Sequence, residues 1–293
     1  FLLIRCIPGT IVEQMLGTEA LTSYETVESL RRYFGLDQPI HIQYAHWIGR
    51  VVVGDLGKSW RMGMPVLTFI LSRLAVTVEL AAIAILVAAL IGVPAGIISA
   101  LKQNRPADNL ARMAALFGLS IPVFWQGTML ILVFSLALRW APPIEWVSPA
   151  ANLRANLEMM LLPGFCLGTA SAAVIMRMTR SCMLDVLRQE YIRTARAKGL
   201  AERSVVGIHG LKNALIPVVT VTGLQMGYLL GGTVVVEEVF GLPGLGRLVL
   251  WAILQRDYPT VQGTVLFIAV MFMVVNLVVD ILYAYLDPRI RRA

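Results

Sequence analysis

The chain has 293 residues, of which 57% are hydrophobic and only 15% are charged, below the roughly 25% charged residues typical of soluble domains. A soluble protein of this length could not bury so much apolar surface, so the composition predicts a polytopic, all-α membrane protein. The net charge of +7 then indicates Lys and Arg on the cytoplasmic side of a membrane rather than nucleic-acid binding. Three scattered cysteines predict no disulfide framework.

The chain opens with the apolar stretch FLLIRCIPG, residues 1–9, which is too short to cross a membrane alone. We expect it to be the outer end of a truncated first transmembrane helix. Residues 10–75 follow as a long extracytoplasmic segment. It is expected to form short amphipathic helices, because apolar residues recur there at helical spacing: Val27, Leu30, Tyr33 and Phe34.

Five later stretches lack Asp, Glu, Lys and Arg and approach the about 20 residues that a spanning helix requires. They are residues 80–101, 113–138, 159–176, 213–236 and 258–279, the third being the shortest at 18 residues. With the truncated first helix, they predict six transmembrane helices. The transmembrane core would cover residues 76–286, with a tail at 287–293.

Basic residues in the short loops predict the orientation. Loops 102–112 and 177–212 and the tail 287–293 carry fourteen Lys and Arg residues, whereas loops 139–157 and 237–257 carry four. Short cytoplasmic loops are enriched in Lys and Arg, so we expect the first set and the C-terminus to lie in the cytoplasm. Segment 10–75 then lies outside.

Two motifs suggest enzymatic chemistry that the sequence does not support. GDLGKS, residues 54–59, ends like a phosphate-binding loop, but Val52 stands where that loop needs glycine. We expect a turn between short helices. Ser120 lies in a span, but no span contains a histidine to act as its base. A helix serine that bonds its own backbone, near a kink at Pro122, is the expected structure.

Ionisable residues near the spans stand at their ends, as snorkelling side chains would. Because intramembrane charges are functional candidates, Glu79 and Asp280 are candidate pathway residues. The outer hairpin at residues 237–257 is interrupted by turn residues, and its apolar stretch 248–254 could dip back toward the membrane. We expect this hairpin to form the outer mouth of a pathway, with four candidate residues: Gly241, Pro243, Gly244 and Gly246.

Loop 177–212 is unusually long and carries a net charge of +5. It is expected to form two short helices, the first covering residues 181–198 and capped by Gly199. The second leads into the next span, with a kink at Pro217. Tyr191, Ala195 and Gly199 fall on one helix face, where small residues would permit close approach of another protein. The pattern predicts a protein-docking role, and the alternative is a solvated positive-inside loop.

The stretch EYIRTARAKGL, followed by HGLKNALIPVVT, resembles the cytoplasmic coupling loop of ATP-binding-cassette importer permeases. Nearly the whole chain resembles the dipeptide, oligopeptide, nickel and glutathione branch, including FGLDQPIHIQYAHWI, GDLGKSW, GLQMGYLLGGTVVVEEVFGLPGLGRL and QRDYPTVQG. The chain departs from the importer-wide pattern where Arg193 stands in place of Glu, and from its own branch where Thr10 replaces the usual Asp.

The resemblance implies a type I importer permease fold in a bacterial inner membrane. It implies a second homologous permease subunit, two cytoplasmic ATPase subunits and an extracytoplasmic substrate-binding protein. ATP and Mg²⁺ would bind the ATPase subunits, and no cofactor or catalytic residue is expected on this chain. The coupling helix would comprise Tyr191, Arg193, Thr194, Ala195, Arg196, Ala197, Lys198 and Gly199, with the three cations pairing with acidic groups of the ATPase.

Two other classes remain open from the residues alone. An ion-driven secondary transporter would show an inverted repeat and polar sites at the membrane midplane, whereas this sequence shows no repeat and few charges at the midplane. A structural membrane scaffold is the other alternative. The sequence does not distinguish peptides, nickel chelates and glutathione as substrates.

Overall fold

The computed structural model describes residues 1–6, 9–16, 24–143 and 145–286, and within them the chain is helical without a β-strand. The helices are α1 (Leu2–Arg5), α2 (Ile11–Leu16), α3 (Tyr24–Tyr33), α4 (Ile40–Val52), α5 (Val66–Leu101), α6 (Pro106–Ser120), α7 (Val123–Leu138), α8 (Leu153–Leu187), α9 (Glu190–Ala197), α10 (Glu202–Ser204), the π-helix η1 (Val205–Leu211), α11 (Lys212–Gly232), α12 (Val234–Val239), α13 (Leu245–Leu254) and α14 (Tyr258–Leu286). The expected tail, residues 287–293, lies outside the described residues.

The chain divides into two compact units. Unit 1 comprises Phe1–Ala75 and Pro243–Ala269, and unit 2 comprises Val76–Leu242 and Val270–Ala293. Among the described residues, four helices are long and apolar enough to cross a membrane, and a fifth span results if the bent pair α6–α7 is counted as one. These helices correspond to the five charge-free stretches of the sequence.

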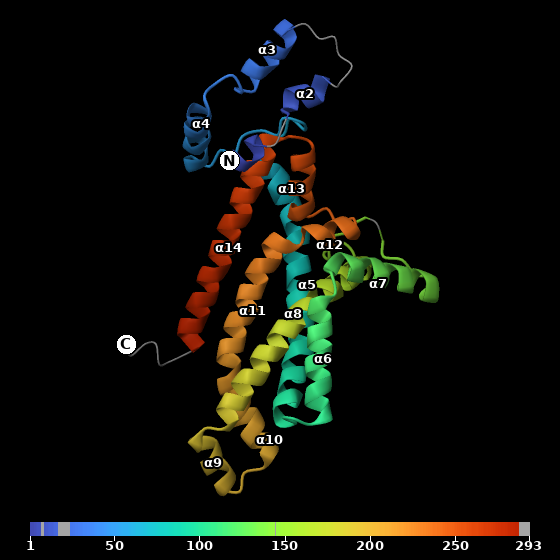
Figure 1. Cartoon of the computed structure of the whole chain (residues 1–293), viewed down its shortest axis with the longest axis vertical. Coiled ribbons are helices and arrows are strands. Elements are labelled where there is room, and N and C mark those ends of the chain that lie inside the picture. The colour runs from blue at the N-terminus through green and yellow to red at the C-terminus, as the bar shows by residue number, and fades with distance from the viewer. Residues whose placement is uncertain (7–8, 17–23, 144, 287–293) are drawn as a thin grey trace. The chain divides into compact units, whose positions relative to one another are not determined.

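The second predicted span is two helices rather than one. Helices α6 and α7 meet at an angle of 100°, which Figure 1 shows as a sharp change of direction after α6. Ile121 between them is extended, with φ −79° and ψ 125°, because the ring of Pro122 disfavours helical backbone in the residue before it. Ser120 Oγ donates to the Leu116 carbonyl at 2.8 Å, which confirms the expected serine–backbone bond.

Helix α8 is the central element of unit 2. It has 35 residues and is contacted by α6, α7 and α11, which lie around it in Figure 1. The predicted third span, residues 159–176, lies within this helix and is shorter than it. The charge-free stretch is shorter than the helix because the helix also contains charged residues near its two ends. Arg154 lies near its start, and Arg177 and Arg180 lie in its last third, where charged groups reach solvent or find partners.

Glycines on the facing sides of α5 and α8 allow the two helices to approach each other closely. A methyl group on Gly96 of α5 would lie 2.6 Å from Thr179 Cβ and 2.7 Å from the Met176 carbonyl oxygen. On α8, a methyl group on Gly168 would lie 2.9 Å from the Ala84 carbonyl oxygen. Such close approach of helices is typical of membrane interfaces, where packing rather than water exclusion drives association. One turn earlier on each helix, the same restriction applies at Gly92 and Gly164.

We predict that Gly96→Ala will lower the free energy of unfolding by about 2 kcal/mol, because the added methyl group would overpack a rigid helix contact. Gly207→Ala is the matched control, since a methyl group there meets no atom within 4 Å. Thermal unfolding of both variants in one detergent measures the difference. Equal midpoints would contradict the close packing of α5 on α8.

In unit 1, the GDLGKSW and QRDYP motifs are joined by a buried aspartate. Asp257, between α13 and α14, accepts hydrogen bonds from Ser59 Oγ, from Trp60 N at 3.1 Å and from Thr260 Oγ1 at 2.8 Å. Ser59 and Asp257 are both buried. The GDLGKS stretch thus forms the expected turn between α4 and α5, and its serine is fully engaged by the protein.

Candidate functional site

Helix α9 is a short, separate helix between α8 and α10. The expected continuous helix over residues 181–198 is wrong, because α8 ends at Leu187 and Gln189 is extended, with φ −70° and ψ 149°. The expected cap is present at the other end. Gly199 has φ +76°, and its N–H donates to the Arg196 carbonyl at 2.9 Å. A left-handed residue at this position is best supplied by glycine.

One face of α9 is held by the loop itself. Ile192 and Ala195 are buried, and they pack with Val205 of η1 and with Leu187 at the end of α8. The structure therefore differs from the expected docking face at Ala195. Its small side chain permits close packing within unit 2 instead of close approach by a partner. A bulky residue at this position would disrupt the packing of the loop itself, so its effect on transport would not measure the docking of a partner.

The Tyr191 hydroxyl also forms hydrogen bonds within its own chain. Its hydroxyl donates to the His209 carbonyl at 3.4 Å and accepts from Asn213 Nδ2 at 3.0 Å, and the same amide group donates to the His209 carbonyl at 3.1 Å. Tyr191 thus connects α9 to η1 and the first turn of α11. A displacement of α9 would act directly on the start of a predicted span.

The rest of α9 and its cap is exposed and basic. Arg193 pairs with Glu190 at 2.7 Å, and Arg196 pairs with Glu202 at 2.7 Å. The hydrogen bonds from Arg196 to Glu202 raise the pKa of Arg196 above its ordinary value. Lys198 makes no ion pair with the part of the chain that the structure describes. Exposed pairs contribute little stability, so these arginines can exchange internal acids for external ones.

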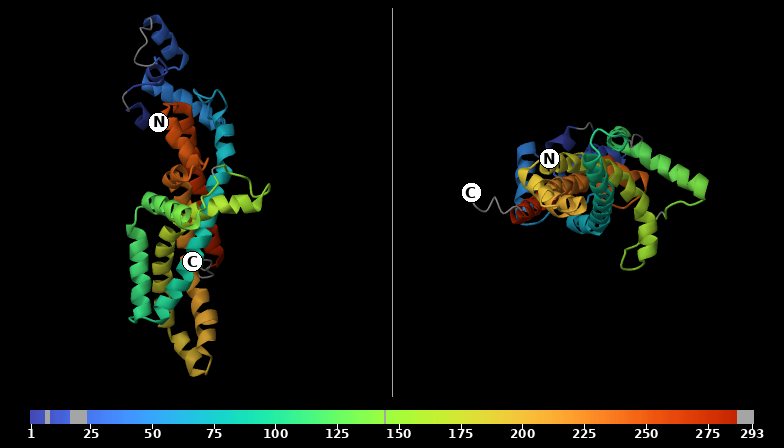
Figure 2. Two further views of the ribbon diagram at one scale, coloured as in Figure 1. Left: turned by 90° about the vertical axis from the view of Figure 1, so that its right-hand side faces the viewer. Right: turned by 90° about the horizontal axis from the view of Figure 1, so that it is seen from below.

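The remaining exposed positions on this surface are Thr194, Ala197 and Gly199. Figure 1 and the left view of Figure 2 show α9 and α10 projecting past the turn between α5 and α6, at one end of unit 2. Helix α9 therefore presents a compact surface of small and basic residues at that end of unit 2.

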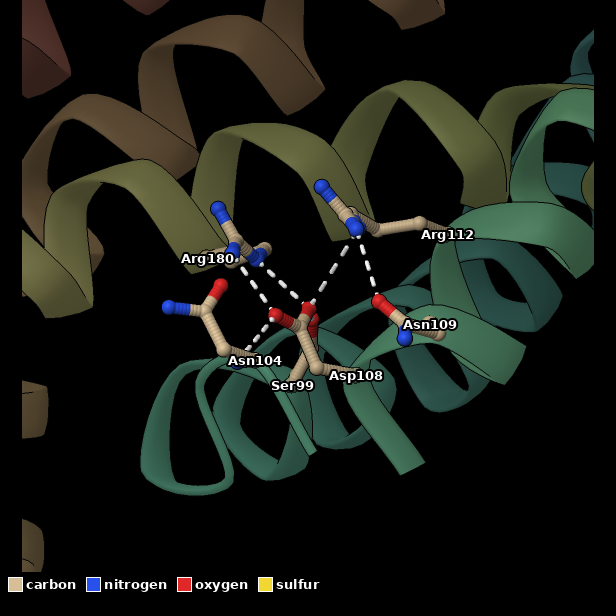
Figure 3. A network of polar contacts seen from close by, with 6 residues as sticks. All are labelled: Ser99, Asn104, Asp108, Asn109, Arg112 and Arg180. Carbon is tan, nitrogen blue, oxygen red and sulfur yellow. Dashed lines mark hydrogen bonds and ion pairs between the residues drawn. The ribbon is translucent and has the colours of Figure 1, made fainter. Parts of the chain in front are cut away.

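A second feature of unit 2 was not found from the sequence. Asp108, in the first turn of α6, is fully buried and accepts a bidentate pair of bonds from Arg180 of α8, each 2.8 Å long (Figure 3). Ser99 Oγ at the end of α5 donates to it at 2.5 Å, and the N–H of Asn104 in the turn donates at 3.0 Å. One carboxylate thus joins α5, α6 and α8.

The candidate pathway residues separate into two groups. In unit 2, Glu79 accepts from Trp146 Nε1 at 3.2 Å, Gly241 has φ +68°, and Asp280 is exposed on α14. In unit 1, Pro243 and Gly244 line a cavity of about 310 Å³, while the candidate Gly246 is buried in α13. The structure therefore brings only Pro243 and Gly244 together around a cavity.

Glu237 is a further residue that the sequence did not single out. It lies in α12, is fully buried, and accepts hydrogen bonds from Thr77 Oγ1 and Thr233 Oγ1, both at 2.8 Å. It connects α12 to α5 within unit 2. The doubled glutamate in VVVEEVFG was the available signal, because an acidic residue inside an apolar stretch requires partners.

The family model described as "Binding-protein-dependent transport system inner membrane component" matches residues 92–292. This chain belongs to that family. The permease is 41% identical to the dipeptide transport system permease protein DppB of Alkalihalophilus pseudofirmus, over 99% of this chain and 93% of the relative. It is 43% identical to the glutathione transport system permease protein GsiC of Escherichia coli K12, over 99% and 92% of the two chains.

Solved structures agree on the fold. An inward-facing structure of the MetNI methionine ABC transporter matches with a TM-score of 0.61 at 14% identity, covering 75% of the permease and 96% of that chain. An amino acid ABC transporter matches with a TM-score of 0.54 at 16% identity, covering 77% and 94%. The predicted importer permease fold is thereby confirmed.

Proposed function

We propose that the permease forms one half of the translocation pathway of an importer for short peptides or similar small solutes. Relatives over 40% identical are named for dipeptide and glutathione transport, and these substrates share a peptide backbone and a free carboxylate. A second homologous permease subunit completes the pathway. An extracytoplasmic binding protein delivers the solute, and residues 10–75 contribute to receiving it.

Helix α9 is the element through which ATP hydrolysis moves this subunit. The observation that carries this proposal is the division of α9 and its cap into two faces: Ile192 and Ala195 are buried within unit 2, while the basic and small residues at 193, 194 and 196–199 are exposed. A partner that grips the exposed face pushes a helix already bonded to the start of α11 through Tyr191. ATP can shift the transporter only through its differential binding to two states.

The ATP and Mg²⁺ belong to two cytoplasmic ATPase subunits, and the permease performs no hydrolysis. Within this chain, the P-loop-like turn has its serine bonded to Asp257, so its hydroxyl is not free to hold a nucleotide-bound metal ion. The permease lies in the bacterial inner membrane with its C-terminus in the cytoplasm.

Purification through a tag on this chain tests the function. The proposal expects an ATPase subunit to co-purify and solute uptake into proteoliposomes to require ATP. An ion-driven transporter would instead take up solute on an imposed proton gradient without ATP. Uptake of a dipeptide or of glutathione, compared in the presence of its binding protein, identifies the substrate class.

Cysteine labelling checks the proposed orientation. In a chain without its three native cysteines, Val53→Cys is expected to react with an impermeant maleimide in spheroplasts, whereas Gln103→Cys is expected to be protected. Both positions are exposed, and Val53 is 79% exposed, so access to the side chain does not limit the reaction. The reverse pattern would invert the orientation and place α9 outside the cytoplasm.

A further inference from the structure

Helix α7 leaves the bundle of unit 2 instead of continuing the crossing that α6 begins. It starts beside the middle of α8, where Gln126 Nε2 donates to Thr169 Oγ1 at 2.7 Å and Cys166 Sγ donates to the Val123 carbonyl at 3.4 Å. Both α8 residues lie within the charge-free stretch 159–176. Because α7 meets α6 at 100°, it runs across the bundle at the depth of the expected span, and the right view of Figure 2 shows it projecting sideways.

One side of α7 packs on α8 and α12, and the opposite side is largely apolar and exposed. Its exposed residues include a row at four-residue spacing: Phe124, Thr128, Leu132 and Leu136. Rows at this spacing form the ridges by which one helix packs on another. Leu136, close to the end of α7, is 73% exposed, so the far half of the helix has the least cover from its own chain.

The end of α7 carries polar groups that lipid cannot satisfy. Arg139 is exposed and makes no ion pair with the part of the chain that the structure describes. The N–H groups of Arg139 and Trp140 both donate to the Phe134 carbonyl, so the cap leaves the last four carbonyls of the helix, residues 135–138, without a bond. Unpaired backbone groups and arginine are both costly in hydrocarbon. This end of α7 therefore requires polar groups beside it.

A groove with a volume of about 500 Å³ lies between the end of α7 and the first turns of α8. Trp140 forms one wall. The other wall is a second row at four-residue spacing, formed by Leu153, Leu157 and Leu161 of α8, all of them exposed. Two apolar ridges that border one groove fit a third helix between them.

The α7 arm, residues 123–139, and the groove also carry opposite charges. Glu158 lines the groove and pairs with Arg154 at 2.9 Å, but the Arg154 side chain is 89% exposed. Such an exposed pair contributes little stability, so Glu158 can accept from a cation that stands where Arg139 stands on another arm.

An arm beside a groove is the arrangement that a pair of similar subunits requires. Two subunits that pair about a two-fold axis present the same patch to each other. A second subunit of this fold therefore brings one arm for this groove and one groove for this arm. Lipid would fill the groove but would leave the end of the arm without polar partners.

We propose that the α7 arm and the adjacent groove form the surface on which the second permease subunit docks, with the arm of each subunit lying in the groove of the other. This inference rests on the function proposed above, and it names the surface through which the two halves of the pathway meet. The first turns of the partner's α8 then supply polar groups to Arg139 and to the carbonyls at the end of α7.

Photo-crosslinking in cells that produce the whole transporter tests this surface. Leu136 is replaced by p-benzoylphenylalanine, and the tagged chain is purified after irradiation. We expect a crosslinked product that contains peptides of a second, non-identical permease of the same family. Leu277 of α14, which is 59% exposed, is the matched control position and should give no product with that permease.

Leu157→Trp supplies an independent measurement, because the indole fills the groove. Overpacking at this contact should lower the amount of second permease recovered with the tagged chain at least about fivefold. Ala151→Trp is the matched control, since Ala151 is exposed in the turn before α8 and lies outside the groove wall. It should leave recovery unchanged. Thermal unfolding of both variants checks that they are folded, and the crosslink at position 136 decides the question if Leu157→Trp is not.

Several results would overturn the docking surface. They are a product at position 136 that contains only lipid, the substrate-binding protein or a second copy of this chain, equal yields of permease product at positions 136 and 277, and full recovery of the second permease by a folded Leu157→Trp variant. If the wild-type chain recovered no second permease at all, the importer architecture proposed above would fail instead.

Discussion

Asp108→Leu will lower the free energy of unfolding by about 3 kcal/mol, because it leaves the Arg180 guanidinium without its counter-charge. Asp108 is fully buried and the Arg180 side chain is 19% exposed, so water can compensate only part of the loss. Ser99 and the Asn104 N–H lose the same acceptor. The turn between α5 and α6 would then be free to separate from α8.

The double variant Asp108→Leu/Arg180→Met tests whether the loss comes from an unpaired charge. Replacing a whole buried ion pair by apolar residues is often close to neutral, so the double variant should unfold nearer to the wild-type temperature than Asp108→Leu alone. Arg112→Gln is the matched control. Arg112 Nε lies 3.7 Å from the same carboxylate and its side chain is 50% exposed, so a change below about 1 kcal/mol is expected.

Thermal unfolding in nanodiscs measures all three variants, and fluorescence of the tryptophans supplies the signal. If the single and double variants lose equal stability, the charge of Arg180 is not the cause. In that case the loss would arise from the broken bonds at the α5–α6 turn.

Transmembrane segments were predictable because lipid imposes a strict rule on sequence. An α-helix in lipid must satisfy its own backbone, and its lipid-facing side chains must be apolar, so charge-free stretches located four apolar helices of span length and the bent pair α6–α7. Their ends were not predictable in the same way. Helix α8 continues beyond its charge-free stretch, through the exposed Arg177 and through Arg180, whose charge pairs with the buried Asp108.

The Asp108–Arg180 pair illustrates why contacts between spans are hidden in a single sequence. The two residues are 72 positions apart, and each separately fits a simpler explanation. Asp108 looks like a helix N-terminal acid, and Arg180 looks like one more basic residue in a cytoplasmic loop. Only the packing of α6 on α8 brings them into contact.

Helix α9 shows the opposite case, in which local rules were nearly sufficient. The glycine cap and the basic last turn follow from helix chemistry, and both are present. The break at Arg188 and Gln189 was missed because no proline or glycine marks it. Because of this break, the apolar side of α9 packs against the rest of the loop. Ala195 is therefore buried rather than exposed on the expected docking face.

Ala197→Trp is expected to reduce ATP-driven uptake at least about fivefold while leaving the permease folded. Ala197 is exposed on α9, so the indole meets no part of its own loop. At a close contact with a partner, a large side chain costs about 1–3 kcal/mol, which corresponds to about 5- to 150-fold in docking affinity. Uptake into proteoliposomes and the amount of co-purified ATPase measure the effect.

Ala151→Trp is the control, because Ala151 is also an exposed alanine, in the loop expected on the opposite side of the membrane. It should leave both uptake and ATPase recovery unchanged.

Gly199→Ala separates docking from backbone strain. Its methyl group would meet no atom within 4 Å, but a left-handed backbone costs a non-glycine residue about 1 kcal/mol, so a modest loss of stability with ATPase still bound is expected. If Ala197→Trp retained full uptake, the exposed face of α9 would not be the surface that the ATPase grips.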